Sequence, residues 1–255
     1  MPDGDGLVLS VVSHGQHGLL LGLLDDLKRH VKTPFRLIVT ENIPEEPHLL
    51  VENYPYSIEV VRNERAKGFG ANHNSALDRA GGGEFCVLNP DIRLHSDPFP
   101  ELRAIANDPG IGVVAPLVTG PDLSPEDHAR DFPSVFTLAA KIFGHRPLTV
   151  PPTTQLIYFP DWVAGMFMLF RSKTVRSLGG FDERYFLYYE DVDLCARMRE
   201  RGLEVAVCTK VSVIHAARRE SRRNLRFALW HMRSALRFFA SRPRLALGLS
   251  SRNPA

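Results

Sequence analysis

Short apolar runs alternate with helical repeats along the first half of the chain. Residues 7–12 form a continuous apolar run, and residues 19–30 follow with leucines at helical spacing opposite a charged face. Residues 35–40, 58–62 and 85–88 are three more β-rich runs, and residues 70–80 form a helical segment between the second and the third of them. Strands that alternate with helices predict an α/β fold, with a Rossmann-like, mostly parallel sheet flanked by helices.

The second half begins with an irregular stretch and ends in a basic helix. Residues 119–160 are rich in Pro, Asp and Thr and have weak periodicity, so they predict a long, mobile loop over the site. A strand, a helix that starts with acids and a last strand are predicted next: residues 165–171, 190–201 and 204–214. Residues 221–240 then form a basic amphipathic helix. We expect one domain over residues 1–216 and a basic helical appendage over residues 217–255.

Composition limits the class of protein. At 255 residues and 44% hydrophobic content the chain can bury one substantial core, and its formal net charge of +2 does not suggest a nucleic-acid binder. Its three cysteines are far apart in the sequence and form no C-x-x-C pair, which fits a reducing cytoplasm. Asp3 and Asp5 stand where a signal peptide would carry positive charge, and no apolar run approaches a spanning length. A cytoplasmic protein, at most peripheral at the inner face of the plasma membrane, is expected.

Polar side chains follow the predicted strands at the edge where a parallel sheet binds ligands. Asp91 ends the sequence Asn89-Pro90-Asp91 directly after a buried strand, where a divalent cation could bridge its carboxylate to a diphosphate. A turn that merely ends the strand explains the tripeptide equally well. His215 ends the last strand and offers a nitrogen ligand to the same cation, although a lone histidine is more often structural.

The predicted helix at residues 190–201 begins with Glu190 and Asp191, just after a cluster of aromatic residues. Apolar walls raise the pKa of a carboxyl group, so one of these acids could serve as a general base. Capping of the helix amino terminus is the structural alternative.

Taken in order, these segments resemble glycosyltransferase family 2 with the GT-A fold, and in particular its branch of rhamnosyl- and galactofuranosyltransferases. The resemblance covers about residues 7–216. It is carried by Arg62-Asn63, KGFGANHN at 67–74, LNPD at 88–91, DWVAG at 161–165, GGFDERYFLYYEDVDLCAR at 179–197 and His215.

The resemblance implies a role for each matching residue. Asp91 corresponds to the metal-binding Asp of the family's DXD element and His215 to the second protein ligand of a Mg²⁺ or Mn²⁺ ion. Asp191 corresponds to the catalytic base, with Glu190 beside it shaping the acceptor site, and Trp162 and Gly165 correspond to the wall near the acceptor and donor sugar. The expected donor-binding residues are Glu41, which would read the nucleobase, and Asn63, Gly68, Asn72, Asn74, Asn89 and Asp91. For the glycine, and for the two asparagines that follow it, a structural role in the strand–helix turn is an equally good explanation.

The implied activity is transfer of a sugar with inversion from a nucleotide-sugar donor, first of all dTDP-rhamnose, to a glycan or lipid-linked acceptor in cell-surface polysaccharide synthesis. The alternative is a GT-A domain that binds nucleotide sugars without catalysis. Three departures from the family pattern leave the donor base and the strength of metal binding open: Ser13-His14-Gly15-Gln16 after the first strand, Glu41 in place of the common Asp, and Asn89 in place of the first acid of DXD.

The C-terminal segment is a local basic patch, with nine arginines and one glutamate in residues 216–245. Its apolar residues fall on one helical stripe: Leu225, Leu229, Met232, Leu236 and Phe239. Such a helix fits an anionic membrane surface, and it equally fits docking of the stripe onto the domain or onto a second copy in a homodimer.

Overall fold

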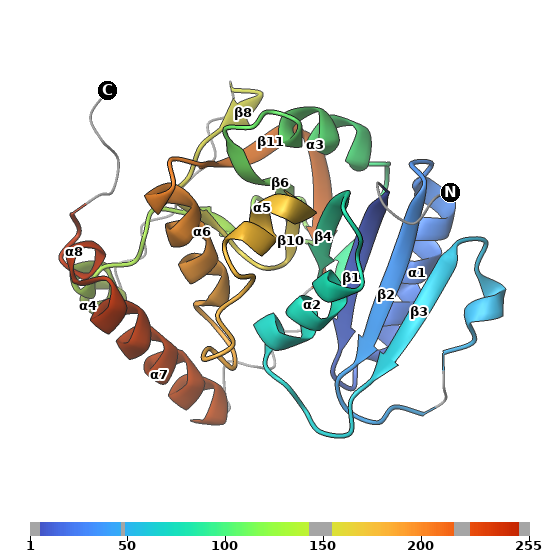
Figure 1. Ribbon diagram of the computed structural model, residues 1–255, viewed down its shortest axis with the longest axis horizontal. Coiled ribbons are helices and arrows are strands. Elements are labelled where there is room, and N and C mark those ends of the chain that lie inside the picture. Colours follow the sequence, from blue (N-terminus) through green and yellow to red (C-terminus); the bar gives the residue numbers. More distant parts are fainter. Residues whose placement is uncertain (1–5, 47–48, 143–154, 217–224, 250–255) are drawn as a thin grey trace.

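A nine-stranded sheet forms the centre of the protein in the computed structural model (Figure 1). The structure describes residues 6–46, 49–142, 155–216 and 225–249. The strands of this sheet are β1 (Leu7–Ser13), β2 (Phe35–Glu41), β3 (Ser57–Arg62), β4 (Glu84–Leu88), β5 (Ile92–Arg93), β6 (Ile111–Thr119), β8 (Ile157–Tyr158), β10 (Phe167–Arg171) and β11 (Glu204–His215). Their order is β3-β2-β1-β4-β10-β6-β11-β5, with β8 paired to β11.

The first half of the sheet is parallel. β1 pairs in parallel with β2 and with β4, and β2 pairs in parallel with β3. These strands are the apolar runs of the sequence. A strand inside a parallel sheet is covered by helices on both faces, so most of its side chains are apolar. Because β1 to β4 are parallel, their carboxyl ends meet at one edge, after Ser13, Glu41, Arg62 and Leu88. The predicted α/β fold with a mostly parallel sheet is confirmed.

Antiparallel β10 joins this half to the rest of the sheet. It pairs antiparallel with β4, so that Phe167 lies opposite Leu88, and antiparallel with β6 on its other side. β6 and β11 are parallel, and the short β5 runs antiparallel to the end of β11. The start of β10 consequently lies beside the end of β4, at the edge where the candidate site residues gather.

Helices cover both faces of the sheet (Figure 1). They are α1 (His17–His30), α2 (Phe69–Asp78), α3 (Phe99–Ala106), α5 (Ser172–Ser177) and α6 (Glu190–Glu200). The C-terminal helices α7 (Leu225–Ser241) and α8 (Pro243–Ala246) lie beyond α6, away from the sheet. Leucines of α1 share one hydrophobic core with Phe99 and Leu102 of α3. α2, α5 and α6 contribute to the core on the opposite face, which also contains Phe238 of α7.

The predicted long loop at residues 119–160 is wrong for much of its described part. β6 extends to Thr119, β7 (Ala129–Arg130) pairs antiparallel with β9 (Trp162–Val163), and α4 (Val135–Ile142) forms a two-turn helix. Short elements held by pairing with a distant strand leave little periodicity in the sequence, which is why the pattern did not reveal them. Residues 143–154, which also belong to that stretch, lie outside the described residues.

The C-terminal helix α7 packs on the domain through a face that the apolar stripe did not indicate. Ala235 and Phe238 are buried in the core, and the Ser234 hydroxyl donates a hydrogen bond of 2.9 Å to the carbonyl oxygen of Leu187. Of the predicted stripe, the first four residues are exposed, namely Leu225, Leu229, Met232 and Leu236. Residues 221–224 of the predicted helix lie outside the described residues, and the domain boundary at residue 216 stays a prediction.

All three cysteines are buried and free. Among the residues that the structure describes, no helix has the length and apolar character needed to cross a membrane.

Candidate functional site

Asp91 and His215 lie side by side where β5 meets the end of β11. β5 begins directly after Asp91, and its first residue, Ile92, pairs with His215. The amide of Ala216 donates a hydrogen bond of 2.9 Å to the carbonyl oxygen of Asp91, which fixes the two strand ends to each other. Nε2 of His215 is 3.2 Å from Oδ2 of Asp91. Two residues separated by more than a hundred positions are thus brought into contact by the strand pairing.

The surroundings of this pair favour a positive charge. Oδ1 of Asp91 is buried without a hydrogen-bond partner among the described residues. On the other side of the ring, Nδ1 of His215 is 2.8 Å from Oε2 of Glu126. Burial alone would lower the pKa of His215, but the hydrogen bonds and charges of Asp91 and Glu126 outweigh it and raise that pKa.

These residues fit a divalent cation. A carboxylate oxygen and a neutral imidazole nitrogen are both ligands of Mg²⁺ or Mn²⁺, and bonds of roughly 2.1 Å place two adjacent ligands of an octahedral ion about 3 Å apart. The distance between Nε2 of His215 and Oδ2 of Asp91 is of that size, at 3.2 Å. No three His, Cys, Asp or Glu side chains in the described part of the chain are grouped to hold a metal by themselves. In phosphate sites Mg²⁺ usually has one or two protein ligands, and substrate oxygens and water complete its coordination.

Glu190 and Asp191 open α6 after an unusual turn. Tyr188 and Tyr189 both have left-handed backbone angles, with φ of 70° and 68°. Such angles strain a bulky residue and persist only where the surroundings hold them. Here the ring of His231 from α7 lies 5.3 Å from each tyrosine ring, measured between centroids. The C-terminal helix therefore supports the turn that aims the two acids.

The two acids have different electrostatic environments. Oδ2 of Asp191 accepts a hydrogen bond of 2.9 Å from the Gly165 amide, and Oδ1 accepts one of 2.8 Å from the Val192 amide. Burial raises the pKa of Asp191, while these amides and the charge of Arg130 hold the rise back. Burial, with the charge of Asp191 added, raises the pKa of Glu190 well above its usual value, and its Oε2 has no partner among the described residues. Asp191 is consequently the acid of the pair that stays ionised more readily.

A short backbone connection links the strand end that precedes Asp91 to Asp191. The amide of Asn89 donates a hydrogen bond of 2.9 Å to the carbonyl oxygen of Met166. Gly165, which precedes Met166, donates a hydrogen bond from its own amide to Asp191. A Cβ at Gly165 would lie 3.0 Å from the Phe69 ring, so this tight position accepts only glycine without rearrangement. The end of β4 and the start of α6 thus meet at residues 165–166.

Trp162 forms a fixed wall beside this junction. It is almost fully buried in β9, and its indole nitrogen donates a hydrogen bond of 3.0 Å to the carbonyl oxygen of Asp131. The guanidinium of Arg130 lies 5.5 Å from the centre of its ring, in the geometry of a cation–π contact. Arg130 is also close enough to Asp191 to influence its pKa.

Glu41 and Asn63 lie at the carboxyl ends of β2 and β3. Glu41 is 4% exposed, and its Oε2 accepts a hydrogen bond of 2.8 Å from Nε of Arg62. The amide of Asn63 donates to the carbonyl oxygen of Glu41 at 3.0 Å. Both predicted donor-binding residues are therefore at the same sheet edge as Asn89, and their roles stay predictions.

Asn63 and Asn72 belong to a buried network of amide groups around Asn42. Nδ2 of Asn63 donates to Oδ1 of Asn42 at 2.9 Å and to Oδ1 of Asn72 at 2.7 Å. Oδ1 of Asn42 also accepts the amide of Lys67 at 2.8 Å. Such a satisfied network holds the loop after β3 in place, so these asparagines have a structural role whether or not they also bind the donor.

Gly68 and Asn74 hold the two most specific sequence blocks against each other. A Cβ at Gly68 would lie 2.8 Å from the carbonyl oxygen of Phe186, so the backbones approach too closely for any larger residue. Oδ1 of Asn74 accepts the amide of Phe181 at 2.8 Å, and its Nδ2 donates to the Phe181 carbonyl oxygen at 2.9 Å. These contacts favour the structural explanation of the motif at residues 67–74.

Two polar residues at the site were not found from the sequence. They are Glu126 at His215 and Arg130 at Trp162. Both fall in the aperiodic stretch, where nothing in the sequence marks one charged residue over another. Asn42, at the centre of the amide network, is marked in the sequence by its place beside Glu41 at a predicted strand end.

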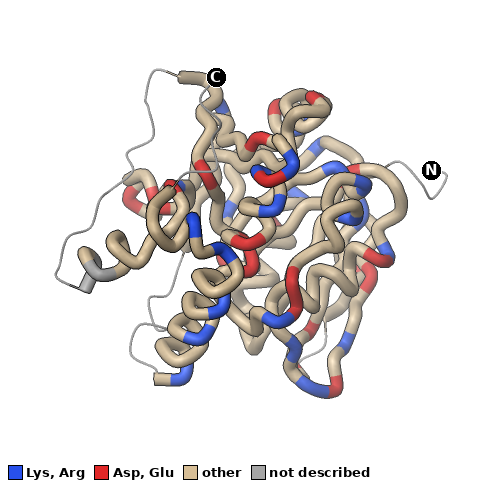
Figure 2. Tube along the Cα trace, turned by 60° about the vertical axis from the view of Figure 1, so that its left-hand side comes forward, with Lys and Arg blue, Asp and Glu red and all other residues tan. Residues whose placement is uncertain are grey.

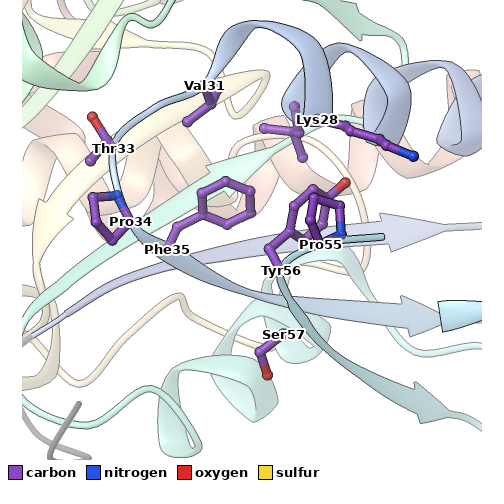
Figure 3. A pocket seen from close by; sticks show the side chains of 9 residues that line it. Lys28, Val31, Thr33, Pro34, Phe35, Pro55, Tyr56 and Ser57 are labelled. Carbon is purple, nitrogen blue, oxygen red and sulfur yellow. The ribbon is translucent and has the colours of Figure 1, made fainter. Parts of the chain in front are cut away.

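A separate hollow lies at the opposite end of the sheet (Figure 3). It has a volume of about 400 Å³ and is bordered by Lys28, Thr33 and Phe35 on one side and by Pro55 and Tyr56 on the other. Lys28 lies in the last turn of α1, and the other four residues lie at the amino ends of β2 and β3. The hollow is therefore remote from the edge that carries the candidate site.

Comparison with known proteins supports the resemblance seen in the sequence. Residues 48–233 match the family model described as "Glycosyltransferase like family 2". The chain is 29% identical to the rhamnosyltransferase WbbL of Escherichia coli K12, over 95% of this chain and 94% of that protein. It is 27% identical to the N-acetylglucosaminyl-diphospho-decaprenol L-rhamnosyltransferase of Mycobacterium tuberculosis, over 95% of this chain and 86% of that protein.

Solved structures show the same fold at low identity. GalNAc-T7, determined with UDP, GalNAc and Mn²⁺, matches 99% of this chain with a TM-score of 0.68 and 15% identity, and the match spans 53% of its own length. The mannosyltransferase PcManGT of Pyrobaculum calidifontis, in complex with GDP-Man and Mn²⁺, matches 92% of this chain and 65% of its own with a TM-score of 0.64 and 16% identity. The predicted GT-A fold is confirmed.

Proposed function

Because this chain belongs to glycosyltransferase family 2, we propose that it transfers a sugar from a nucleotide-sugar donor to an acceptor hydroxyl in a single inverting displacement. The observation that carries the proposal is that residues 165–166 are bonded both to the segment before the cation ligand and to the proposed base. Asn89, two residues before the cation ligand Asp91, bonds to Met166, and Asp191 bonds to Gly165. A group for the leaving diphosphate and a group for the acceptor proton are therefore available on either side of one short segment.

Asp91 and His215 are the residues that would hold a divalent cation, Mg²⁺ or Mn²⁺. Such an ion stabilises the negative charge that develops on a diphosphate leaving group. Asp91 offers its unpartnered Oδ1 together with Oδ2, and His215 offers Nε2. Asn89 contributes no charge in the position where the family usually has an acid, so we expect tight metal binding only together with the donor.

Asp191 would act as the general base. It takes the proton of the acceptor hydroxyl while the hydroxyl oxygen bonds to the anomeric carbon and the bond from that carbon to the diphosphate oxygen breaks. Its two backbone hydrogen bonds occupy part of the capacity of a carboxylate, which can accept about four. Glu190, whose raised pKa favours the neutral form, is assigned to shaping the acceptor side rather than to taking the proton.

Rhamnose carried by dTDP is our first choice of donor. The relatives with coverage of most of both chains are named rhamnosyltransferases. The name of the mycobacterial relative also specifies a sugar diphosphate on a polyprenol as its acceptor. We therefore propose a glycan or lipid-linked acceptor in cell-surface polysaccharide synthesis, with Glu41 and Asn63 on the nucleobase side.

A lipid-linked acceptor requires a membrane surface, and α7 offers one face to it. Leu225, Leu229, Met232 and Leu236 are 55–81% exposed along one side of this helix. α7 carries arginines and no acid, as its charge pattern in Figure 2 shows. Pairing of two copies through this helix would bring like charges together, whereas anionic lipid would attract them. We propose peripheral association with the cytoplasmic face of a membrane in preference to a homodimer through α7.

The proposed activity is tested by incubating the purified chain with a panel of nucleotide sugars, with and without Mn²⁺, and measuring release of the nucleoside diphosphate. We expect one donor to be consumed and the reaction to require the ion. A domain that only binds nucleotide sugars would bind one of them, as measured by calorimetry, and release no nucleoside diphosphate even with a polyprenyl-diphosphate sugar acceptor present. That result would replace the catalytic proposal by the binding one.

A further inference from the structure

Glu126 is a carboxylate on the far side of the His215 ring from Asp91. Its Oε2 is 2.8 Å from Nδ1 of His215, while Nε2 of the same ring faces Oδ2 of Asp91 at 3.2 Å. The side chain of His215 is 14% exposed and that of Glu126 is 27% exposed, so solvent competes only partly for this contact. The imidazole is held between two carboxylates, one at each nitrogen.

The backbone places Glu126 independently of this contact. The Glu126 amide donates to the Val118 carbonyl oxygen at 2.9 Å, and Thr119 forms an antiparallel bridge with Pro125. On the other side, the carbonyl oxygen of His128 accepts the amide of Ala164 at 2.7 Å, next to Gly165. Glu126 therefore lies in a segment tied at both ends to the strands that build the site.

A neutral imidazole carries a single proton, which the partner of each nitrogen assigns. A cation bound between Nε2 and Asp91 would require the lone pair of Nε2. The single proton of the ring would then be on Nδ1, where the Glu126 carboxylate can accept it. In metal sites, a histidine ligand commonly donates its other N–H to a carboxylate, which fixes its tautomer and orientation and increases its basicity. The arrangement of Glu126, His215 and Asp91 has this form.

We propose that Glu126 is a positioning residue that holds His215 in the tautomer and orientation required to bind the cation. The inference rests on the proposed function, because it assumes that Asp91 and His215 bind Mg²⁺ or Mn²⁺ beside a nucleoside diphosphate. Glu126 itself is not a ligand: it contacts the nitrogen that points away from Asp91. It makes the binding of the ion depend on a residue in a segment that the sequence marks only as a loop.

The test is a titration of Mn²⁺, followed by electron paramagnetic resonance, in the presence of dTDP and separately of UDP and GDP. Glu126→Ala is expected to weaken Mn²⁺ binding roughly 10–100-fold, the usual effect of losing such a partner. The near-isosteric Glu126→Gln keeps an oxygen that can accept from Nδ1, so it is expected to lose less. The nucleotide alone should bind equally to all variants. The control is Asp122→Asn, which changes a carboxylate of the same segment that accepts the Ser124 amide at 3.1 Å. It should leave Mn²⁺ affinity within about twofold and so exclude a general loosening of the loop.

A double-mutant cycle distinguishes positioning from unrelated damage. If Glu126 acts through His215, Glu126→Ala has no further effect on Mn²⁺ affinity once His215→Ala is present. Additive losses, or Glu126 variants with unchanged affinity while His215→Ala is weakened, would overturn the proposal and leave the cation site intact. A wild-type chain that binds no Mn²⁺ with any of the three nucleotides would instead overturn the cation role in the proposed function. Thermal unfolding of each variant shows whether it is folded.

Discussion

The backbone amide of Gly165 donates a hydrogen bond of 2.9 Å to Oδ2 of Asp191. This bond joins the start of α6 to the segment before β10, and through Asn89 and Met166 to the end of β4. The orientation of Asp191 is therefore set by the sheet as well as by its own helix. In the proposed mechanism the Gly165 amide would therefore orient the base, a role distinct from the sugar-facing wall that the motif suggests.

Asp191→Asn is expected to lower the turnover rate by roughly 10²–10⁴-fold, the usual contribution of a general base. The amide keeps the size of the side chain and can still accept the Gly165 hydrogen bond, but it cannot take a proton at neutral pH. Binding of the nucleotide sugar with Mn²⁺ should be unchanged. Steady-state kinetics with donor in excess provide the first measurement and calorimetry the second. A variant that retains full turnover would reduce Asp191 to a structural acid.

Asp193→Asn, two residues further along the same helix, serves as the comparison for Asp191→Asn. The structure predicts that it lowers the stability of the protein. The carboxylate of Asp193 is nearly fully buried and binds Arg197 at 2.8 Å and Arg242 at 2.7 Å. Removing its charge weakens the pairing of two partly buried guanidinium groups, although Arg242 keeps Glu200 as a partner, and we expect a cost of about 1–3 kcal/mol in the free energy of unfolding. Chemical denaturation measures this cost. Unchanged stability together with lost turnover would point to a catalytic role for Asp193 instead.

Asp91→Ala and His215→Ala are each expected to weaken Mn²⁺-dependent binding of the donor. Each variant removes a ligand of the ion. Removal of a residue that only supports a ligand lowers metal affinity roughly 10–100-fold, so we expect these variants to lose at least as much affinity. Binding measured in EDTA should differ little between variant and wild type, because the nucleoside contacts remain. Glu84→Gln, at the opposite end of β4, serves as a control for a lost carboxylate. Equal Mn²⁺ dependence in wild type and both variants would contradict the assignment.

The alternation of apolar runs and helical repeats predicted the parallel half of the sheet because β1, β2 and β4 are buried on both faces. β6 was not predicted, although it is as apolar as the strands of the parallel half. It follows α3, and no polar cluster marks its end in the sequence. Motif order predicted Asp91, Asp191 and His215, and the structure brings Asp91 and His215 together through strand pairing.

Other site features depend on contacts between distant segments and leave no local pattern. Glu126 is one acid in a stretch rich in acids, and only its contact with His215 distinguishes it. The helix α7 is apolar on two sides, so periodicity alone could not indicate that Ala235 and Phe238 dock while Leu229 stays exposed. In both cases the deciding information is the identity of the partner surface.

The buried Glu190 predicts a dependence of stability on pH. Its folded-state pKa is raised well above the usual value of a glutamate, because burial and the charge of Asp191 disfavour ionisation. The unfolded chain ionises first as the pH rises, so this residue lowers stability progressively from about pH 4.5 up to its folded pKa. Glu190→Gln removes this term and is expected to unfold at higher denaturant concentration than wild type at neutral pH, with the difference vanishing below pH 4. A variant less stable than wild type at pH 7 would indicate that the carboxylate has a stabilising partner.

The exposed stripe of α7 is expected to govern binding to anionic membranes. Leu229 and Met232 are 58% and 55% exposed, and the double substitution Leu229→Gln with Met232→Gln removes apolar surface without touching the docked face of the helix. Each fully buried side chain of this size contributes about 1.5–3 kcal/mol, so partial insertion of two should make the loss at least roughly tenfold. Arg233→Gln should cost about fivefold, from about 1 kcal/mol for a basic residue near an anionic surface.

The measurement is co-sedimentation with vesicles of phosphatidylglycerol and phosphatidylcholine, at low and high salt. Leu50→Gln is the matched control, because Leu50 is also well exposed, at 57%, but lies between β2 and β3, far from α7 in the sequence. It should leave vesicle binding unchanged, and all variants should keep wild-type donor hydrolysis because neither surface contains a site residue. If the α7 variants bind vesicles as wild type does but shift a concentration-dependent dimer to monomer in sedimentation equilibrium, the stripe is an interface between two copies and the membrane assignment is wrong.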